Sequence, residues 1–239
     1  MRTLGVLGGM GPAATIDFMA KVYAADPAER EQDRVRLLVD CDPAVLDRNA
    51  AVRGEGASPG PDLARMAKGL AAAGADGLVI ACNTAHAWTA DIEAAVAIPV
   101  LSIIEAVCDE LAPLDVRRIG VLAGQGCLDA GLYQNAFAAR GWEAVLPGPA
   151  GQAAFMAALY RIKSGQFGEA ERAALVACAD ETIAAGAQAV VAGCTEVPLL
   201  LTAAHVAVPL IDSSQALAER AVAWARGGGD GESRDRAEH

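Results

Sequence analysis

Two cysteines follow apolar runs, and each begins a short polar motif. Cys82 lies in GLVIACNTAH, which begins at Gly77, and Cys194 lies in AVVAGCTE, which begins at Ala189. A thiolate can remove a proton from carbon, and a thiol can return one. Two thiols that face each other across a substrate can therefore invert a carbon that bears hydrogen. Because the two roles exchange in the reverse reaction, such a site should be nearly symmetric.

A symmetric pair needs two similar structures to hold it, and the sequence repeats itself. Three segments recur in the same order at nearly equal separations, namely AAAGADGLVIAC with IAAGAQAVVAGC, LGVLGGMG with IGVLAGQG, and IPVL with VPLI. We infer two similar α/β domains related by a pseudo-two-fold axis, with the active site in the cleft between them. The first domain is expected to comprise residues 1–112 and 212–226, and the second residues 113–211. The polar, Gly-rich residues 227–239 are predicted to be a disordered tail.

Strand-like apolar runs alternate with Ala-rich runs of helical spacing, which is typical of βαβ units in doubly wound, mostly parallel sheets. Strands are predicted at residues 3–9, 34–42, 77–82, 98–103, 117–124, 142–147, 189–194 and 208–212. Ligands of open α/β sheets bind beyond the carboxyl ends of the strands, so both cysteines should reach the cleft. A helix is predicted after each cysteine, and the positive end of its dipole would favour the thiolate.

Polar residues next to the cysteines carry groups suited to a substrate with a carboxylate. Asn83, Thr84 and Thr195 can donate hydrogen bonds to that carboxylate. Such donors would stabilise the negative charge that develops when the adjacent carbon loses its proton.

Two ionisable residues also lie close to the cysteines in sequence. His86 lies one helical turn after Cys82, where it can orient the thiol or cap the helix. Glu196 follows Cys194 and can tune the thiol or bind a substrate ammonium group. The alternative for Glu196 is a solvated carboxylate at the start of a helix, which the helix dipole would also favour.

Several motifs resemble those of one enzyme family. They are GGMGPAAT from Gly8, DR at Asp47, ACNTAH from Ala81, the lysine of RIKSG, and GCTEVPLL from Gly193. They span nearly the whole chain, and together they are similar to the aspartate/glutamate racemase family, specifically its aspartate racemase branch. The resemblance implies racemisation of acidic amino acids by two cysteines without pyridoxal or another cofactor, usually in a homodimer.

The resemblance also implies roles for individual residues. The residues that match α-carboxylate ligands are Asn83, Thr84 and Thr195. Arg48 and Lys163 match residues that hold the side-chain carboxylate. Met10, in the GGMG turn, is also expected to bind the substrate.

One turn departs from the family pattern. The family usually has a Thr-rich turn after the strand IGVLA, whereas this chain has GQGC from Gly124 to Cys127. Gly124 and Cys127 lack the threonine hydroxyls that bind the carboxylate in the family, and backbone N–H groups of the turn are expected to take their place. Cys127 is near the predicted cleft and is treated as a supporting residue. Cys41, Cys108 and Cys178 stand in apolar contexts and are expected in the core.

Other functions remain open. GGMGPAA fits the dinucleotide fingerprint G-x-G-x-x-A after a strand, with Asp40 or Asp42 as the ribose acid, which would indicate an NAD(P)-dependent oxidoreductase. Against this, Pro12 stiffens the turn, and the second half repeats the strand without completing the motif. An amino-acid-binding module with inert cysteines, and a related decarboxylase or isomerase, are further alternatives.

Composition restricts the partners. The net charge is -11 and no block of five Lys or Arg residues occurs, which disfavours nucleic-acid binding. No signal peptide or membrane-spanning run is recognised, so a cytoplasmic protein without membrane contact is expected. The six cysteines form no C-x-x-C pair, so no metal site is predicted. The expected ligand is a small acidic amino acid.

Overall fold

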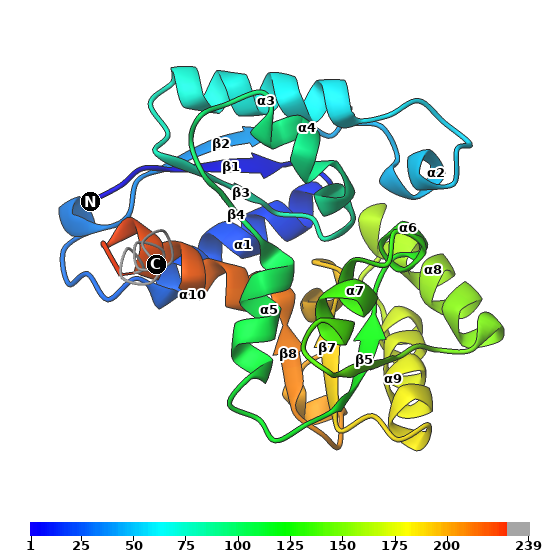
Figure 1. Ribbon diagram of the computed structural model, residues 1–239. Helices are drawn as coiled ribbons and strands as arrows, with labels where there is room; N and C mark the ends of the chain where they lie inside the picture. Colours follow the sequence, from blue (N-terminus) through cyan, green and yellow to red (C-terminus); the bar gives the residue numbers. More distant parts are fainter. Residues whose placement is uncertain (229–239) are drawn as a thin grey trace, which may run out of the picture.

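Each half of the chain forms one four-stranded sheet, and the two sheets have the same strand order (Figure 1). The computed structural model describes residues 1–228 of the 239-residue chain. The first sheet, ordered β2-β1-β3-β4, contains β1 (Leu4–Gly8), β2 (Leu37–Cys41), β3 (Gly77–Ile80) and β4 (Val100–Leu101). The second, ordered β6-β5-β7-β8, contains β5 (Arg118–Leu122), β6 (Glu143–Val145), β7 (Ala189–Ala192) and β8 (Leu210–Asp212). All neighbouring strands are parallel, which confirms the predicted α/β class.

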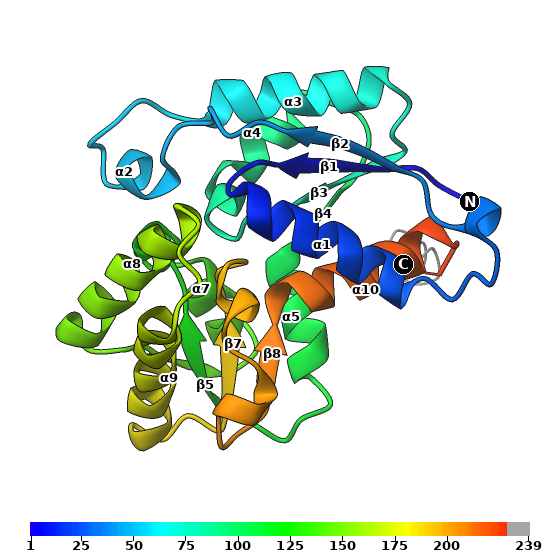
Figure 2. The ribbon, with the colours of Figure 1, turned by 180° about the vertical axis from the view of Figure 1, so that it is seen from behind.

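Helices connect the strands and cover both faces of each sheet (Figure 1 and Figure 2). They are α1 (Pro12–Ala25), α2 (Arg48–Val52), α3 (Gly60–Ala72), α4 (Thr89–Glu93), α5 (Ile103–Leu111), α6 (Gln125–Asp129), α7 (Leu132–Ala138), α8 (Pro149–Lys163), α9 (Glu169–Ala184) and α10 (Ser213–Ala225). The first residue of both α1 and α8 is a proline, whose fixed φ and missing N–H suit the first helical turn.

Successive residues of the central strands point into different cores. In β3, Leu78 and Ile80 pack with α3, whereas Val79 lies in a central core. In β7, Val190 packs with α8 and α9, whereas Val191 lies in the same central core. This alternation follows from the two-residue period of a strand, and runs that are apolar on both faces are typical of parallel sheets covered by helices. The central core therefore joins the two halves.

Two helices cross the boundary between the halves. Helix α10 follows β8 of the second sheet but packs against α1 of the first half (Figure 2). Helix α5 follows β4 of the first sheet and contacts α10, α7 and β8. Ile103, Val107 and Leu217 from these helices are fully buried in the central core. Because α5 and α10 share one core, the division into residues 1–112 plus 212–226 and residues 113–211 stays a prediction.

The structure differs from the predicted elements in places. Strands β3 and β7 end at Ile80 and Ala192, before the cysteines rather than at them. Cys41, predicted in the core, is exposed, because β2 is an edge strand whose other residues are only half-buried. Gly227 and Gly228, predicted to begin the tail, form the hydrogen-bonded turn that ends α10. The rest of the predicted tail, residues 229–239, lies outside the described residues.

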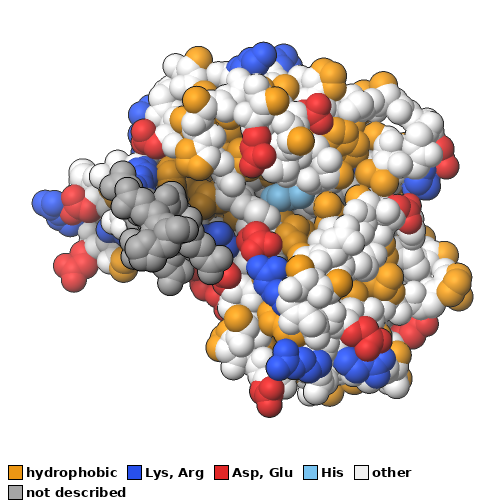
Figure 3. Space-filling model, in the orientation of Figure 1, with side chains coloured by type: hydrophobic (Ala, Val, Ile, Leu, Met, Phe, Trp, Pro, Cys, Tyr) orange, Lys and Arg blue, Asp and Glu red, His pale blue; other side chains and the backbone are white. Residues whose placement is uncertain are grey.

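The surface carries mixed charges. On the face shown in Figure 3, Lys and Arg side chains are interspersed with Asp and Glu side chains over both halves. None of the helices within residues 1–228 combines the length and apolarity needed to cross a bilayer.

Candidate active site

The two predicted catalytic cysteines follow equivalent strands, β3 and β7. Both are nearly buried, since Cys82 is 7% exposed and Cys194 is 8% exposed. The two thiols lie within electrostatic range of each other, because a charge on Cys82 raises the pKa of Cys194. A hydrogen bond from Thr195 Oγ1 to the Ala81 carbonyl also joins the two cysteine loops directly. The structure therefore brings both thiols to the boundary between the halves.

Neither cysteine is followed directly by an α-helix. The chain forms the 3₁₀ helix η2 (Thr84–Trp88) after Cys82 and the 3₁₀ helix η3 (Val197–Leu199) after Cys194. So short a helix aligns few peptide dipoles, and the predicted stabilisation of a thiolate by a helix dipole is therefore wrong. Burial raises the pKa of Cys194 well above its usual value, and the Glu196 carboxylate raises it further. Cys194 is a protonated thiol at neutral pH.

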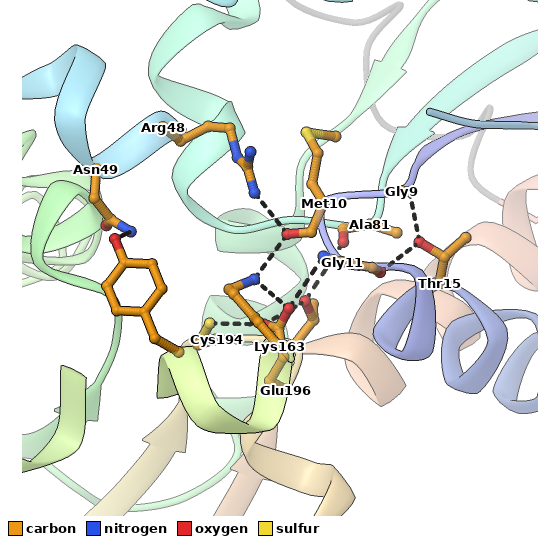
Figure 4. A network of polar contacts seen from close by, with 12 residues as sticks. Gly9, Met10, Gly11, Thr15, Arg48, Asn49, Ala81, Lys163, Cys194 and Glu196 are labelled. Carbon is orange, nitrogen blue, oxygen red and sulfur yellow. Dashed lines mark hydrogen bonds and ion pairs between the residues drawn. The ribbon is translucent and has the colours of Figure 1, made fainter. Parts of the chain in front are cut away.

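Glu196 is only 2% exposed and has a partner on each oxygen. Its Oε2 accepts a hydrogen bond from Cys194 Sγ at 3.0 Å, and its Oε1 accepts one from the Gly11 N–H at 3.1 Å (Figure 4). Lys163 Nζ donates to Oε1 and forms an ion pair with it. Burial alone would raise the pKa of Glu196, but the Lys163 charge and the thiol hydrogen bond leave it below its usual value. Glu196 is therefore an ionised, buried carboxylate, and the alternative of a solvated one is wrong.

The two predicted cations converge on one backbone oxygen. Arg48 Nη2 and Lys163 Nζ each donate to the Met10 carbonyl at 2.9 Å (Figure 4). Arg48 Nη1 also donates to the carbonyls of Val45 and Leu46, at 3.0 and 2.8 Å. The Met10 side chain is buried in the core between β1 and α3, so Met10 meets these cations through its carbonyl alone. An anionic group of a ligand would compete with this carbonyl for both cations.

Asn83, Thr84 and Thr195 are all buried, but they differ in what they bind. Asn83 Oδ1 accepts a hydrogen bond from Tyr133 OH at 2.6 Å, and Asn83 Nδ2 donates to Ser213 Oγ at 3.0 Å. Thr195 Oγ1 donates a long hydrogen bond of 3.4 Å to a backbone carbonyl of the first half. The Thr84 hydroxyl has no hydrogen-bond partner within residues 1–228. Tyr133 and Ser213 could not be recognised from the sequence, because they meet Asn83 only in the folded chain.

His86 binds the backbone around Cys82 rather than its thiol. Its Nε2 accepts a hydrogen bond from the Ile103 N–H at 3.1 Å, so Nδ1 carries the proton and donates to the Cys82 carbonyl at 3.0 Å. Burial lowers the pKa of His86 to about 4. The imidazole is therefore neutral at neutral pH, and it fixes the backbone that carries Cys82.

The N–H groups of Gln125 and Gly126 in the GQGC turn already have partners inside the protein. The Gln125 N–H donates to Met156 Sδ at 3.2 Å, and the Gly126 N–H donates to Asn49 Oδ1 at 2.9 Å. The prediction that such N–H groups replace the missing hydroxyls is therefore wrong for these two. Asn49, a buried residue of α2 that sequence analysis misses, also donates to Tyr160 OH of α8 at 3.2 Å. These contacts tie α2 of the first half to α6 and α8 of the second.

Cys127 lies close to the cysteine pair but is fully buried in the central core. Burial raises the pKa of Cys127, and a charge on Cys82 raises it further, so Cys127 is a neutral thiol at neutral pH. Cys108 and Cys178 are buried as predicted, and burial raises the pKa of each to about 11. Cys127 and Cys108 therefore pack as apolar side chains, and the neutral Cys178 thiol donates to the Gly151 carbonyl at 3.2 Å.

The GGMG turn is occupied by groups of the chain itself. Gly9 has a φ of +87°, and a Cβ there would lie 2.4 Å from the Asp42 backbone, so only glycine fits. Thr15 Oγ1 accepts the Gly9 N–H at 2.9 Å and donates to the Gly11 carbonyl at 3.0 Å. The Gly11 N–H, at the start of α1, donates to Glu196, whose negative charge would repel a pyrophosphate. These features oppose the alternative of a dinucleotide site.

Known proteins resemble the chain over nearly its whole length. The profile of a family described as Asp/Glu/Hydantoin racemase matches residues 7–221. RacX of Bacillus subtilis, described as a broad specificity amino-acid racemase, is 25% identical over 228 residues, which cover 92% of this chain and 96% of RacX.

Solved structures share the fold. Aspartate racemase of Picrophilus torridus is 27% identical, with a TM-score of 0.85 and a match that covers 95% of each chain. Glutamate racemase of Francisella tularensis, solved in complex with D-glutamate, is 20% identical, with a TM-score of 0.67 over 93% of this chain and 80% of that one. The second likeness concerns the fold alone. Because the family profile spans most of the sequence, the chain belongs to the Asp/Glu/hydantoin racemase family.

Proposed function

We propose that the protein racemises an acidic amino acid by moving the α-proton between Cys82 and Cys194. The observation that carries this proposal is the pair of nearly buried thiols after β3 and β7, one of them hydrogen-bonded to Glu196. Membership of a racemase family supports the reaction class. No cofactor enters the proposed reaction, because the thiols themselves carry the protons.

In the proposed reaction the Cys82 thiolate removes the α-proton from one face, and the Cys194 thiol delivers its own proton to the opposite face. Negative charge develops next to the α-carboxylate, where the Thr84 hydroxyl is a suitable donor. Glu196 orients the Cys194 thiol before transfer. For the opposite enantiomer the Cys194 thiolate takes the proton, and the charge of Lys163 favours that thiolate.

Arg48 and Lys163 support an acidic substrate. Both donate to the neutral carbonyl of Met10. A carboxylate is a better acceptor, because charge-assisted hydrogen bonds are about twice as strong as neutral ones. The distal carboxylate of aspartate or glutamate would replace the carbonyl between the two cations, whereas the methyl group of alanine cannot.

The proposal is tested with the purified protein and each enantiomer of aspartate, glutamate and alanine in D2O. Chiral chromatography measures inversion, and NMR measures deuterium at the α-carbon. The acidic amino acids should invert and carry deuterium in the product enantiomer, and alanine should react much more slowly. If no amino acid is inverted or deuterated, the proposed reaction is excluded. Equal rates with alanine would remove only the acidic preference and would favour a broad specificity.

Arg48→Ala tests the proposed contact with the distal carboxylate. Losing a hydrogen bond to a charged group costs about 1.5–3 kcal/mol, so the ratio of kcat/KM for aspartate to that for alanine should fall about 10- to 150-fold. The ratio is the useful measure, because Arg48 also binds backbone carbonyls and a loosened segment would slow all substrates. Arg53→Ala is the matched control, since Arg53 pairs with the exposed Glu55 in the same segment. An unchanged ratio in Arg48→Ala would place the distal carboxylate elsewhere.

A further inference from the structure

A buried tyrosine contacts both cysteine loops. Tyr133, on α7 of the second half, is the largest of the fully buried side chains within residues 1–228. Its hydroxyl donates to Oδ1 of Asn83, the residue that follows Cys82, at 2.6 Å. Its ring packs on Gly193, the residue that precedes Cys194, so closely that a Cβ there would lie 2.9 Å from Tyr133 Cε2. The Tyr133 side chain therefore lies between the two cysteine loops and contacts both.

Hydrogen bonds continue from Asn83 to the strand that leads to Cys194. Asn83 Nδ2 donates to Ser213 Oγ at 3.0 Å, and Ser213 Oγ donates to the carbonyl of Ala192 at 2.7 Å. Ala192 is the last residue of β7. The hydrogen bonds from Tyr133 through Asn83 and Ser213 thus join the loop that carries Cys82 to the strand that leads to Cys194. Each of these three side chains is at most 2% exposed.

This arrangement allows only one orientation of the Asn83 amide. Ser213 gives its single hydroxyl proton to Ala192, so towards Asn83 it can only accept. The Tyr133 phenol keeps its proton, because burial raises its pKa well above the usual value, and it can therefore donate to the amide oxygen. The amide therefore keeps its oxygen towards Tyr133 and its nitrogen towards Ser213. The second N–H of Asn83 has no partner among residues 1–228.

We propose that Tyr133 is a positioning residue for racemisation. It holds the Asn83 amide so that its second N–H is available to the substrate α-carboxylate, and it fixes the position of the Cys82 loop relative to Cys194. This inference rests on the proposed two-thiol reaction. A positioning role differs from a purely structural one because it affects the ratio of α-hydrogen exchange to inversion. A misplaced Cys82 loop would let a carbanion formed by one thiol regain a proton from the same face, so that exchange would outrun inversion.

Tyr133→Phe tests the inference, because it keeps the ring and removes only the hydroxyl. We expect kcat/KM for inversion to fall between about 10- and 100-fold, since small misplacements of reacting groups have effects of this size. We also expect the ratio of α-hydrogen exchange to inversion, measured by NMR and chiral chromatography in D2O, to rise several-fold. Ser213→Ala removes the next link and should raise the same ratio, which keeps the inference testable if Tyr133→Phe fails to fold.

Phe137→Leu is the structural control. Phe137 is buried on the same helix with its ring centroid 5.6 Å from that of Tyr133, and it makes no polar contact with either loop within residues 1–228. It should lower the thermal unfolding temperature and leave the exchange-to-inversion ratio unchanged. If Tyr133→Phe and Ser213→Ala behave like Phe137→Leu, Tyr133 is only a packing residue. If the wild-type protein neither exchanges nor inverts, the proposed function fails before the inference is reached.

Discussion

The loops that follow β3 and β7 occupy equivalent places in the two sheets, yet they surround their cysteines with different groups. When Cys82 is aligned with Cys194, Thr84 corresponds to Glu196. The Thr84 hydroxyl is neutral and has no hydrogen-bond partner within the described chain, whereas the Glu196 carboxylate is ionised and binds the Cys194 thiol. Duplication of the fold repeats the position of the thiol but not its surroundings.

This difference gives the two thiols unequal starting roles in the proposed reaction. Burial and the Glu196 charge keep Cys194 protonated, so Cys194 begins as the proton donor. Cys82 has no carboxylate partner among the residues that the structure describes, and the proposed reaction gives it the starting role of base. The nearly symmetric site predicted from the repeat is therefore symmetric in position and asymmetric in charge.

Replacing either cysteine by serine should have the largest effect. Acid–base groups contribute about 10²- to 10⁴-fold to rates, and a hydroxyl is a far weaker acid than a thiol. Cys82→Ser and Cys194→Ser should each lower racemisation about 10³-fold or more. Each variant keeps one thiol, so each should still exchange the α-hydrogen of one enantiomer in D2O. The residual exchange should be slower in Cys82→Ser, which retains only the protonated Cys194.

The control for both variants is Cys178→Ser. Cys178 is buried on α9, makes no polar contact with either catalytic cysteine within residues 1–228, and donates to the Gly151 carbonyl at 3.2 Å, a contact that a serine can keep. Its racemisation should stay near that of the wild type. Near-normal racemisation by either Cys82→Ser or Cys194→Ser would rule out the two-thiol mechanism. Exchange of the same enantiomer by both would show that the thiols do not face opposite sides of the substrate.

Glu196→Gln should have the next largest effect, because it removes the charge that distinguishes the second loop. Losing a charged hydrogen bond to the Cys194 thiol should slow racemisation about 10- to 100-fold. Since Lys163 remains and the opposing charge is gone, the pKa of Cys194 should fall. Alkylation of Cys194 at neutral pH, followed by mass spectrometry, should therefore be faster than in the wild type. Glu143→Gln, which removes an exposed carboxylate paired with Arg118, should change neither measurement.

Most of the fold could be predicted because its signals are local. Apolar runs such as GLVI and AVVA become strands buried on both faces, and their repetition in order predicts two equivalent sheets. The edge of a sheet is not encoded locally, so Cys41 in an apolar run was expected in the core but is exposed. The exact ends of β3 and β7 depend on the 3₁₀ helices that follow them, and their sequences resemble the start of an α-helix.

The site was less predictable, because its contacts join residues that are far apart in sequence. The cysteines could be located from the repeat and from the polar residues after them. The sequence does not determine whether the Glu196 carboxylate is buried or solvated. It is buried because the Gly11 N–H and the Lys163 ammonium group, which are distant in sequence, bind it. Asn83 carried a clear polar signal, but its amide is held by Tyr133 and by Ser213 of α10. No local sequence pattern predicts such partners.

The smallest effect concerns His86, which has no titratable counterpart in the second loop, because the aligned residue there is Pro198. Burial lowers the pKa of His86 to about 4, whereas the unfolded chain binds the proton near pH 6.5. Above pH 6.5 both states are neutral, and the stability is fully present. As the pH falls from 6.5 towards 4, only the unfolded state gains the proton, so stability is lost. From pH 7 to pH 5 this single group should lower the free energy of unfolding by about 2 kcal/mol.

Denaturant unfolding of the wild type and of His86→Gln at both pH values measures this contribution. At pH 7 the variant should be less stable by about 1–3 kcal/mol, because the Cys82 carbonyl and the Ile103 N–H lose well-placed partners. At pH 5 this difference should shift by about 2 kcal/mol in favour of the variant, because glutamine cannot take up the proton in the unfolded state. His205→Gln is the control, since His205 is half-buried, lies outside the site and hydrogen-bonds with Thr202. A gap of equal size at pH 7 and pH 5 would mean that His86 is not buried as a neutral imidazole, and the contrast between the two loops would then rest on Glu196 alone.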